Sequence, residues 1–577
     1  MNTWILVSFV LFTAFVAVVS WIATKKEDLK SSSGYFLGGR GLTGISIGCS
    51  ILLTNWSADQ LIGLNGQGYA FGLSNMGWPV TSAIAFILMA TVFLPYFLKT
   101  GITTIPELIE RRFGATTRNV IAVCILINMA AIALPAVVYA GALGMSKVFN
   151  VSELLGISDS SAIVLSIILI TLIGSIYSIF GGLKAVVVSD TINGIGFFIG
   201  SILVLIVALQ ALGGGDFSDG MYKLVTENQH MLNAVTAPTV TVPFSALFTG
   251  MILVNVYFAC TNQVIIQRAL GAKNLEEGQK GVLIAALIKI ISIAILIFPG
   301  IIAFHLYGHE GIHGDEAYPI LINRLLPSYM IGIFGAILFG AVISTFNSTI
   351  NSCSTIFALN IYKPLCKKEP SAEKCITAGK YFGAFLGIFS ALVAPYIKNA
   401  PDGIYMFFQE FNSILTVPML LMIIVGMLSK RATPKATISG GATYVALYLF
   451  FKFGYQGLDL HFLHQSALFF TIGAIVTLVM THIEPAKEEI VIKQDAPVEV
   501  KNWKHLRLAN IVILVIMVAT YALASPIGIV TEPENILRNV LVICVASVIS
   551  IFGLNLLCKK YLRRRSWSLL PVESTQS

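Results

Sequence analysis

The chain has 577 residues, enough for three or four soluble domains, but 56% hydrophobic against 11% charged residues exclude that organisation. A mean hydropathy of +0.83 requires a solvent other than water, so the chain is predicted to be a polytopic membrane protein. The net charge of +8 comes from bases that fall between apolar stretches instead of forming one patch, so nucleic acid is not an expected partner.

A helix needs about 20 apolar residues to cross a bilayer. Windows of this size predict fifteen transmembrane helices and an all-α polytopic fold. The predicted spans are approximately 4–24, 42–69, 76–98, 120–145, 162–180, 185–212, 244–266, 282–306, 330–361, 381–396, 404–428, 436–451, 466–480, 508–523 and 540–557.

The charges of the loops orient these spans, because Lys and Arg collect on the cytoplasmic side. Clusters of bases follow every odd-numbered span except the fifth, and the intervening loops are poor in bases; examples are Lys25 and Lys26, Arg111 and Arg112, Lys367 and Lys368, and Lys559 to Arg565. We therefore expect a multi-pass protein of the plasma (inner) membrane, with the N-terminus outside and the C-terminus cytoplasmic. The first span is expected to be retained, since no basic segment precedes it.

The second predicted span is unusually polar. It contains Leu-Thr-Asn-Trp-Ser-Ala-Asp-Gln at 53–60, followed by Gly63, Asn65, Gly66, Gln67 and Gly68. Such a segment favours a local helix break, whose free carbonyls and half-helix ends can hold a cation and a solute. The alternative is an unbroken helix whose small residues admit a close neighbour. This span alone does not decide between the two.

The seventh span is similar, with Asn255, Tyr257, Phe258, Thr261, Asn262 and Gln263. Spans two to six and seven to eleven form two blocks of five, and an odd number inverts the second block relative to the first. This topology predicts an inverted repeat with a site near the midplane. The expected divisions are an N-terminal helix and linker (1–41), the first repeat (42–212), an outer loop (213–243), the inverted repeat (244–428), and C-terminal helices with a cytoplasmic tail (429–577).

The ninth span carries Ser344, Thr345, Asn347, Ser348 and Thr349. Hydroxyls and carbonyls without carboxylates suit a hard monovalent cation. The alternative is that these hydroxyls bond back to their own helix. The charged residues within or near the spans are Lys289, Asp190 and Glu410.

One motif suggests an enzyme. His309-Glu310-Gly311-Ile312-His313 matches the H-E-x-x-H pattern of zinc proteases, which requires both histidines on one helical face. Gly311 and Gly314 weaken a helix in this predicted outer loop. We therefore do not expect the protein to be an enzyme. The alternative, a membrane metalloprotease, would depend on His309 and His313.

The sequence resembles the sodium/solute symporters, and within them the bacterial sodium/galactose cotransporters, over roughly residues 35 to 480. The motifs that carry the resemblance are Gly-Tyr-Phe-Leu-Gly-Gly-Arg at 34–40, Asn55 to Gln60 with Gly63 and Gly68-Tyr69, Thr104-Ile105-Pro106-Glu107, Gly-Gly-Leu-Lys-Ala-Val at 181–186 with Asp190, Asn262-Gln263 to Gln267-Arg268, and Ile343-Ser344-Thr345 with Asn347 and Asn351. The resemblance implies a leucine-transporter-type fold of two inverted five-helix repeats.

The resemblance also implies functional residues. For sodium, the co-transported ion, it implies the carbonyls of Leu53, Trp56 and Ala341 and the hydroxyls of Ser344 and Thr345, with Asp190 on the exit path. For the solute it implies Asn55, Gln60, Ser82, Asn255, Lys289 and Gln409. The implied gating aromatics are Trp78, Phe258 and Tyr257.

Two positions depart from the galactose carriers. Pro79 stands where they have a Glu, and Phe258 stands where they have an inner gating Tyr. A fifteenth span also exceeds the usual fourteen. The expected function is a sodium-coupled symporter that imports a sugar or related polyol by alternating access. The alternative is an organic acid, sialic acid or amino compound whose carboxylate pairs with Lys289 or Arg268. The identity of the solute, the sodium stoichiometry and the oligomeric state stay open.

Overall fold

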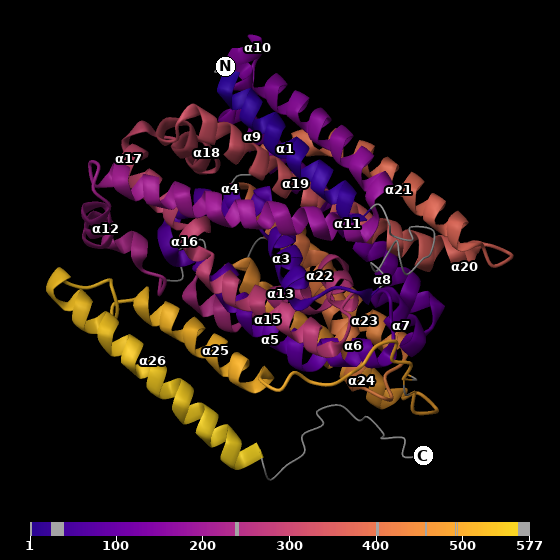
Figure 1. The fold of residues 1–577 in the computed structure, drawn as a ribbon. Coiled ribbons are helices and arrows are strands. Elements are labelled where there is room, and N and C mark those ends of the chain that lie inside the picture. Colours follow the sequence, from indigo (N-terminus) through magenta and orange to yellow (C-terminus); the bar gives the residue numbers. More distant parts are fainter. Residues whose placement is uncertain are drawn as a thin grey trace.

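The computed structural model describes residues 3–24, 40–236, 242–399, 403–455, 458–490, 492 and 494–562, and every regular element in these ranges is helical. Figure 1 shows long helices packed around a central group that includes α3, α13 and α22. The all-helical class predicted from composition and hydropathy is confirmed.

The first half of the chain supplies α1 to α12. Their bounds are α1 Thr3–Thr24, α3 Gly44–Asn55, α4 Ala58–Phe71, α5 Gly77–Leu88, α6 Leu94–Thr100, α7 Ile105–Phe113, α8 Ala115–Asn128, α9 Leu134–Val148, α10 Val151–Leu155, α11 Asp159–Leu212 and α12 Phe217–Thr226. π-Helical turns at Met89–Phe93 and Met129–Ala133 join α5 to α6 and α8 to α9.

The second half supplies α13 to α26. Their bounds are α13 Gly250–Val256, α14 Gln263–Leu270, α15 Leu275–Ile291, α16 Ile293–Leu296, α17 Phe298–Tyr307, α18 Gly314–Leu325, α19 Ser328–Ile356, α20 Lys363–Leu365, α21 Ala372–Val393, α22 Gly403–Leu428, α23 Pro434–Leu449, α24 Phe462–Ile483, α25 Leu506–Leu523 and α26 Pro533–Leu562.

Helix α11 is continuous over 54 residues. A straight helix of this length would measure about 80 Å, more than twice the hydrocarbon thickness of a bilayer. Figure 1 shows it as two arms set at an angle, the first beside α1 and α21 and the second ending near α12. The two spans predicted at 162–180 and 185–212 thus fall within one bent helix.

The number of spans differs from the prediction. Within the described residues, eleven helices are long and apolar enough to cross a membrane, or twelve if the bent pair Gly250–Thr261 and Gln263–Leu270 counts as one span. The predicted number of fifteen is not confirmed. Helical segments such as Ala58–Thr100, at 43 residues, exceed the roughly 20 residues of one crossing, because consecutive helices join without a gap.

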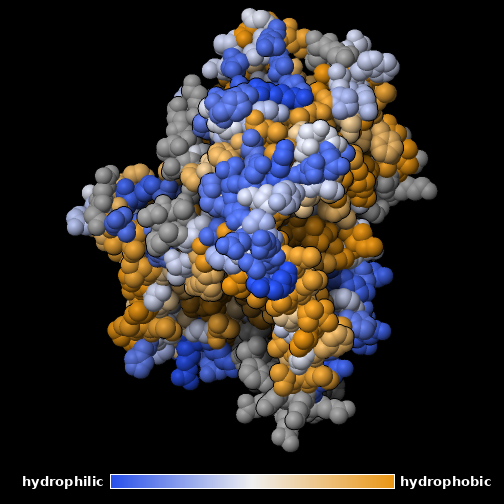
Figure 2. All heavy atoms as spheres, turned by 90° about the vertical axis from the view of Figure 1, so that its left-hand side faces the viewer, coloured by the Kyte–Doolittle hydropathy of each residue, from blue (hydrophilic) through white to orange (hydrophobic). Residues whose placement is uncertain are grey.

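The surface alternates between polar and apolar zones. Figure 2 looks onto the end of the molecule that carries α12, where hydrophilic side chains gather across the middle of the face with hydrophobic ones beside them. Helix α26 is almost unburied, and Leu541, Val545 and Phe552 along it are more than half exposed. Such a helix is stable in lipid but not in water, which agrees with a multi-pass membrane protein.

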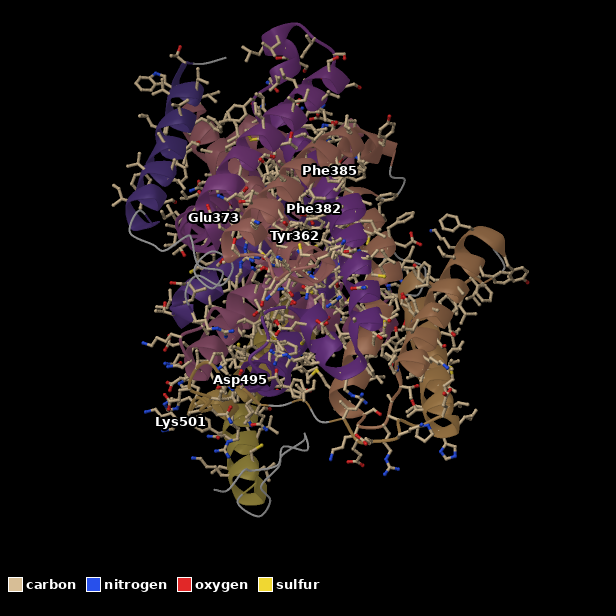
Figure 3. The ribbon with its side chains drawn as sticks, turned by 90° about the vertical axis from the view of Figure 1, so that its right-hand side faces the viewer. Tyr362, Glu373, Phe382, Phe385, Asp495 and Lys501 are labelled. Atoms are coloured by element: carbon tan, nitrogen blue, oxygen red, sulfur yellow. The ribbon has the colours of Figure 1, made fainter. Side chains whose placement is uncertain are left out.

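Residues 494–505, which precede α25, form an extended strap across several helix ends. The Asp495 N–H donates to the Lys99 carbonyl at 3.0 Å, and the Leu275 N–H donates to the Glu499 carbonyl at 3.0 Å. At its end, the Trp503 N–H donates to Gln279 Oε1 at 2.8 Å. Figure 3 places Asp495 of this strap at the opposite end of the view from the aromatic side chains of α21. The strap therefore links α6 to α15.

Candidate functional site

The second predicted span is broken. Helix α3 ends at Asn55, Trp56 leaves the helical conformation with ψ of 58°, and α4 begins at Ala58. The Trp56 ring stacks on Phe197 and Phe198 of α11, with ring centroids 5.4 and 6.2 Å apart. The break places the carbonyl end of α3 opposite the N–H end of α4, which attract a cation and an anion respectively.

The glycines of this span also allow close packing. A Cβ added at Gly68 would lie 2.5 Å from the Ile297 carbonyl oxygen, and one added at Gly63 would lie 2.7 Å from Tyr405 Cβ. Asn65 links the same helices, since its amide donates to the Ile295 carbonyl at 3.3 Å and accepts the Gly300 N–H at 2.9 Å. The span is therefore broken at Trp56, as the first interpretation predicts, and its small residues in α4 admit close neighbours, as the alternative predicts.

The seventh predicted span is interrupted as well. Segments Gly250–Thr261 and Gln263–Leu270 meet at 41°, after a π-helical turn at Tyr257–Thr261. Asn262 sits at the bend, and its side-chain oxygen accepts the Val264 N–H at 3.0 Å, which caps α14. The prediction of a second interruption at an Asn is confirmed.

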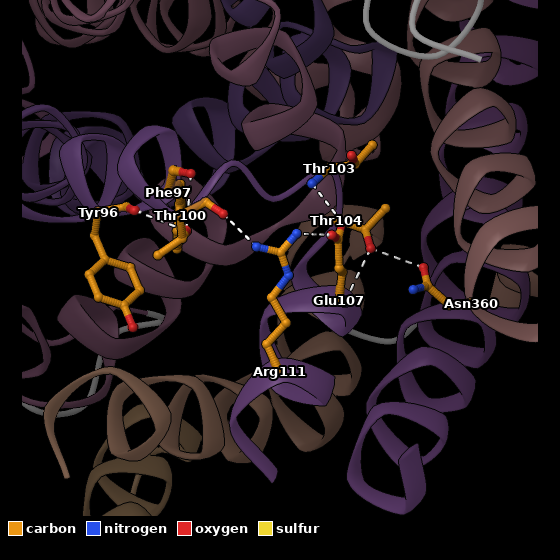
Figure 4. A network of polar contacts seen from close by, with 8 residues as sticks. All are labelled: Tyr96, Phe97, Thr100, Thr103, Thr104, Glu107, Arg111 and Asn360. Carbon is orange, nitrogen blue, oxygen red and sulfur yellow. Dashed lines mark hydrogen bonds and ion pairs between the residues drawn. The ribbon is translucent and has the colours of Figure 1, made fainter. Parts of the chain in front are cut away.

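A polar network holds this second bend. Gln263 Oε1 accepts the Ile105 N–H at 3.0 Å, and its Nε2 donates to the Thr103 carbonyl at 3.3 Å. Figure 4 shows Thr104 beside Asn360, to which its hydroxyl donates at 3.0 Å. The loop after α6 is thus tied to α14 and to the turn after α19, so a movement of either would strain this network.

A cavity of about 90 Å³ lies between the two breaks. A single ordered water needs roughly 10–15 Å³ on a comparable measure, so the cavity can hold several waters or part of a small solute. All six residues assigned to the solute from the sequence line it: Asn55, Gln60, Ser82, Asn255, Lys289 and Gln409. Trp78 and Phe258 also line it, whereas Tyr257 is buried away from the lining, so its gating role gains no support from position.

Several lining groups hold one another in place. Lys289 Nζ donates to Gln60 Oε1 at 2.9 Å, and Asn255 Nδ2 donates to Thr81 Oγ1 at 2.9 Å. The Ser82 hydroxyl instead donates to the Pro79 carbonyl at 2.6 Å, within its own helix. The cavity therefore has a partly fixed wall of hydrogen-bonding side chains.

Two lining groups are left without partners. Both amide atoms of Asn55 are buried, and they find no hydrogen-bond partner among the described residues. The indole N–H of Trp78 is in the same condition. A buried polar group without a partner costs about 1–3 kcal/mol, so groups of this kind beside a cavity point to a ligand or water that completes them.

Sequence reasoning left several polar lining residues unassigned, among them Asp59, Asn128 and Asn412. Asn128 Nδ2 donates to Asn412 Oδ1 at 2.9 Å, and Asp59 accepts the Ser57 hydroxyl. Each is a polar residue within a predicted apolar span. Polar residues at membrane depth indicate function, so the sequence contained a signal that could have identified them. Asn412 also follows Gln409 by three residues, which places both on one helical face.

The residues assigned to sodium come from α3 and α19, which are in contact. Ala341, Ser344 and Thr345 are all buried on α19, and Thr345 also lines the cavity. Trp56 lies at the end of α3, where helix carbonyls are free to bind a cation. The side chains of Leu53 and Asp190 lie outside the described part of the structure.

Arg268, assigned to a solute carboxylate in the alternative, is not at the cavity. It is 1% exposed, its Nε donates to Ser50 Oγ at 2.8 Å, and its Nη2 donates to Ser348 Oγ. It thereby joins α14 to α3 and α19. Its contacts support a structural role.

The H-E-x-x-H segment does not form a zinc site. His309 and Glu310 lie in a short 3₁₀ turn, Gly311 takes φ of 66°, and Glu310 is paired with Arg324 through two contacts of 2.7 and 2.8 Å. The two histidines therefore do not share a helical face. Over the described residues, His, Cys, Asp and Glu form no group of three that could hold a metal ion.

Comparison with known proteins agrees with this geometry. Residues 35–443 match the model of the sodium:solute symporter family. The chain is 44% identical over 532 residues to the uncharacterized symporter YidK of Escherichia coli K12, covering 92% of each chain. It is 29% identical to the sodium/glucose cotransporter of Vibrio parahaemolyticus, covering 81% of this chain and 89% of the relative.

The fold is shared with a solved symporter. The structure of a sodium-coupled sialic acid symporter, in a substrate-bound outward-open state, superposes with a TM-score of 0.72. It is 22% identical and covers 84% of this chain and 99% of its own. The chain therefore belongs to the sodium:solute symporter family, is a transporter and not an enzyme, and carries sodium as its co-transported ion.

Proposed function

We propose that this symporter imports a neutral sugar or related polyol. The observation that carries the proposal is the cavity at the two helix breaks, whose lining includes Asn55 and Trp78, with their unpartnered amide and indole N–H, beside several other polar side chains. A polyhydroxylated solute offers both donors and acceptors, so it can satisfy the two atoms of the Asn55 amide together. The aromatic ring of Trp78 suits the apolar face of a sugar ring.

The proposed sodium site lies beside this cavity. Sodium held by the carbonyls of Leu53, Trp56 and Ala341 and the hydroxyls of Ser344 and Thr345 would fix the end of α3 against α19. Because Asn55 is the last residue of α3, fixing that end orders Asn55 for the solute. Asp190 would receive sodium on its way out.

The proposed transport cycle uses two inverted five-helix repeats, 42–212 and 244–428, flanked by 1–41, 213–243 and 429–577. The two interrupted helices belong to different repeats, so rocking one repeat against the other exposes the cavity alternately. We place the N-terminus outside and the C-terminus in the cytoplasm of the plasma (inner) membrane, from the distribution of Lys and Arg.

The driving force is sufficient for accumulation. Entry of one sodium ion at about −100 mV releases about 2.3 kcal/mol. A tenfold inward gradient adds about 1.4 kcal/mol. One sodium ion can therefore concentrate a neutral solute on the order of 500-fold.

A second candidate is an organic acid, sialic acid or amino compound. Lys289 favours it, because its ammonium group lines the cavity. Uptake of labelled hexoses, polyols and sialic acid into proteoliposomes, with sodium compared with choline, separates the two. Accumulation of a neutral member supports the proposal, and accumulation of only charged members would replace it with the second candidate.

A further inference from the structure

Asp59 is the feature of the cavity that the proposed function leaves unused. It lies in the first turn of α4, is 4% exposed, and lines the cavity. Among the lining residues that the structure describes, Asp59 and Lys289 are the two that carry a formal charge. A carboxylate in a membrane-embedded solute site is costly to bury, which favours a functional role.

The carboxylate occupies the place that an anionic ligand would take. The N-terminus of a helix attracts anions through its free N–H groups and its dipole. At α4, the Asp59 carboxylate already lies in the first turn and accepts the Ser57 hydroxyl, while the N–H groups of Gln60 and Leu61 donate to the Ser57 carbonyl. The half-helix end therefore has a built-in anion.

Lys289 is balanced in the same way. Its ammonium group donates to Gln60 Oε1 at 2.9 Å, and Gln60 directly follows Asp59 in α4, so the two charged side chains line the same cavity. The formal charges of the lining residues, one negative and one positive, therefore sum to zero. A neutral solute leaves this balance intact, whereas a solute carboxylate would add a second negative charge near Asp59.

We propose that Asp59 is the charge-selecting residue of this symporter: it fills the anion position at the α4 N-terminus and balances Lys289, so that the cavity accepts neutral polyols and rejects anionic ones. This inference rests on the proposed function and assigns the selection to one side chain. It predicts that removing the Asp59 charge converts the cavity into one that accepts a carboxylate.

The test compares Asp59→Asn with the wild type in proteoliposomes. The probes are D-glucose, D-galactose and myo-inositol with the matched anions D-glucuronate and D-galacturonate, measured as inhibition of labelled neutral uptake. The expected result is that the affinity for each uronate, relative to the affinity for its neutral partner, rises at least about tenfold. This is the effect of removing one close like charge. Asp315→Asn is the matched control, because Asp315 is also buried but accepts the Ile404 N–H away from the cavity. Its ratio should equal that of the wild type.

The outcomes separate the two proposals. An unchanged ratio in Asp59→Asn, with neutral uptake retained, overturns the role of Asp59 and leaves the proposed function standing. A wild type that accumulates uronates in preference, or none of the probes, overturns both. If Asp59→Asn folds but does not transport, thermal stabilisation by the same solutes decides: stabilisation by a uronate supports the inference, and its absence overturns it.

Discussion

Asn55 and Asn65 lie on either side of the break between α3 and α4. We expect truncation to Ala to change the stability of the protein in opposite directions at these two positions. Asn65 on α4 makes three hydrogen bonds, donating to the Leu61 and Ile295 carbonyls and accepting the Gly300 N–H. Asn55 makes none within the described residues, although it is 2% exposed. The perturbation is the truncation of each to Ala, in otherwise identical protein.

The magnitudes follow from these contacts. Asn65→Ala leaves the Ile295 carbonyl and the Gly300 N–H without this partner, at about 1–3 kcal/mol for each buried group, so we expect about 2–6 kcal/mol of lost stability. Asn55→Ala removes two unsatisfied atoms, and after the lost packing we expect the solute-free protein to gain about 1 kcal/mol.

The solute affinity should change in the other direction. If Asn55 makes two hydrogen bonds to a neutral solute, each worth about 0.5–1.5 kcal/mol, Asn55→Ala raises the half-saturating concentration about 5- to 150-fold. Thermal unfolding of the detergent-solubilised protein in sodium, with and without solute, measures the first effect, and uptake kinetics measure the second. A loss of stability in Asn55→Ala equal to that in Asn65→Ala, with unchanged solute affinity, would refute the reasoning.

Three further predictions concern the ion and the polar ends of the helices. Ser344→Ala with Thr345→Ala should raise the half-saturating sodium concentration at least about tenfold, since two oxygen ligands are lost, and an unchanged sodium curve in uptake assays would exclude this ion site. The Gly44 N–H, which donates to Glu277 at 2.7 Å, lowers the pKa of that carboxyl. Its stabilising effect is present above the ordinary Glu pKa of about 4.3 and is lost as the pH falls through the lowered value, so Glu277→Gln should show a weaker loss of stability than the wild type over that acidic range in pH-dependent melting. Asp495→Pro, which deletes a backbone donor of the strap, should speed tryptic cleavage of the strap several-fold relative to Asp495→Ala, and equal rates would show that this bond does not hold it.

Much of the fold follows from the sequence because the bilayer imposes simple rules. Apolar length locates most helices to within a few residues, as for 4–24 against Thr3–Thr24 and 404–428 against Gly403–Leu428. Polar residues at membrane depth locate both interruptions, because a helix rich in Asn, Ser and Gly can leave its hydrogen-bond ladder at low cost.

The remainder depends on tertiary contacts. Hydropathy cannot reveal that 159–212 is one bent helix, since a bend and a loop have the same apolar composition. Nor does it indicate the strap, whose polar residues resemble a solvated loop until Lys99, Leu275 and Gln279 supply its partners. Both features require knowledge of which segments meet.

The cavity shows the same division. The resemblance to a known family identified six of its polar residues, whereas Asn128 and Asn412 are paired across α8 and α22, 284 positions apart in sequence. Asp59 was visible within the broken span, but its meaning depends on Lys289, which approaches from α15. The charge balance of a site cannot be derived before its walls are assembled.

Accumulation of labelled D-glucose, D-galactose and myo-inositol by proteoliposomes, under an inward sodium gradient and under an equal choline gradient, tests the central claim most directly. We predict that at least one neutral solute rises well above its external concentration with sodium, and that the accumulation disappears in choline or when a sodium ionophore collapses the gradient. Equal uptake in sodium and choline, or accumulation of anionic solutes alone, would contradict it.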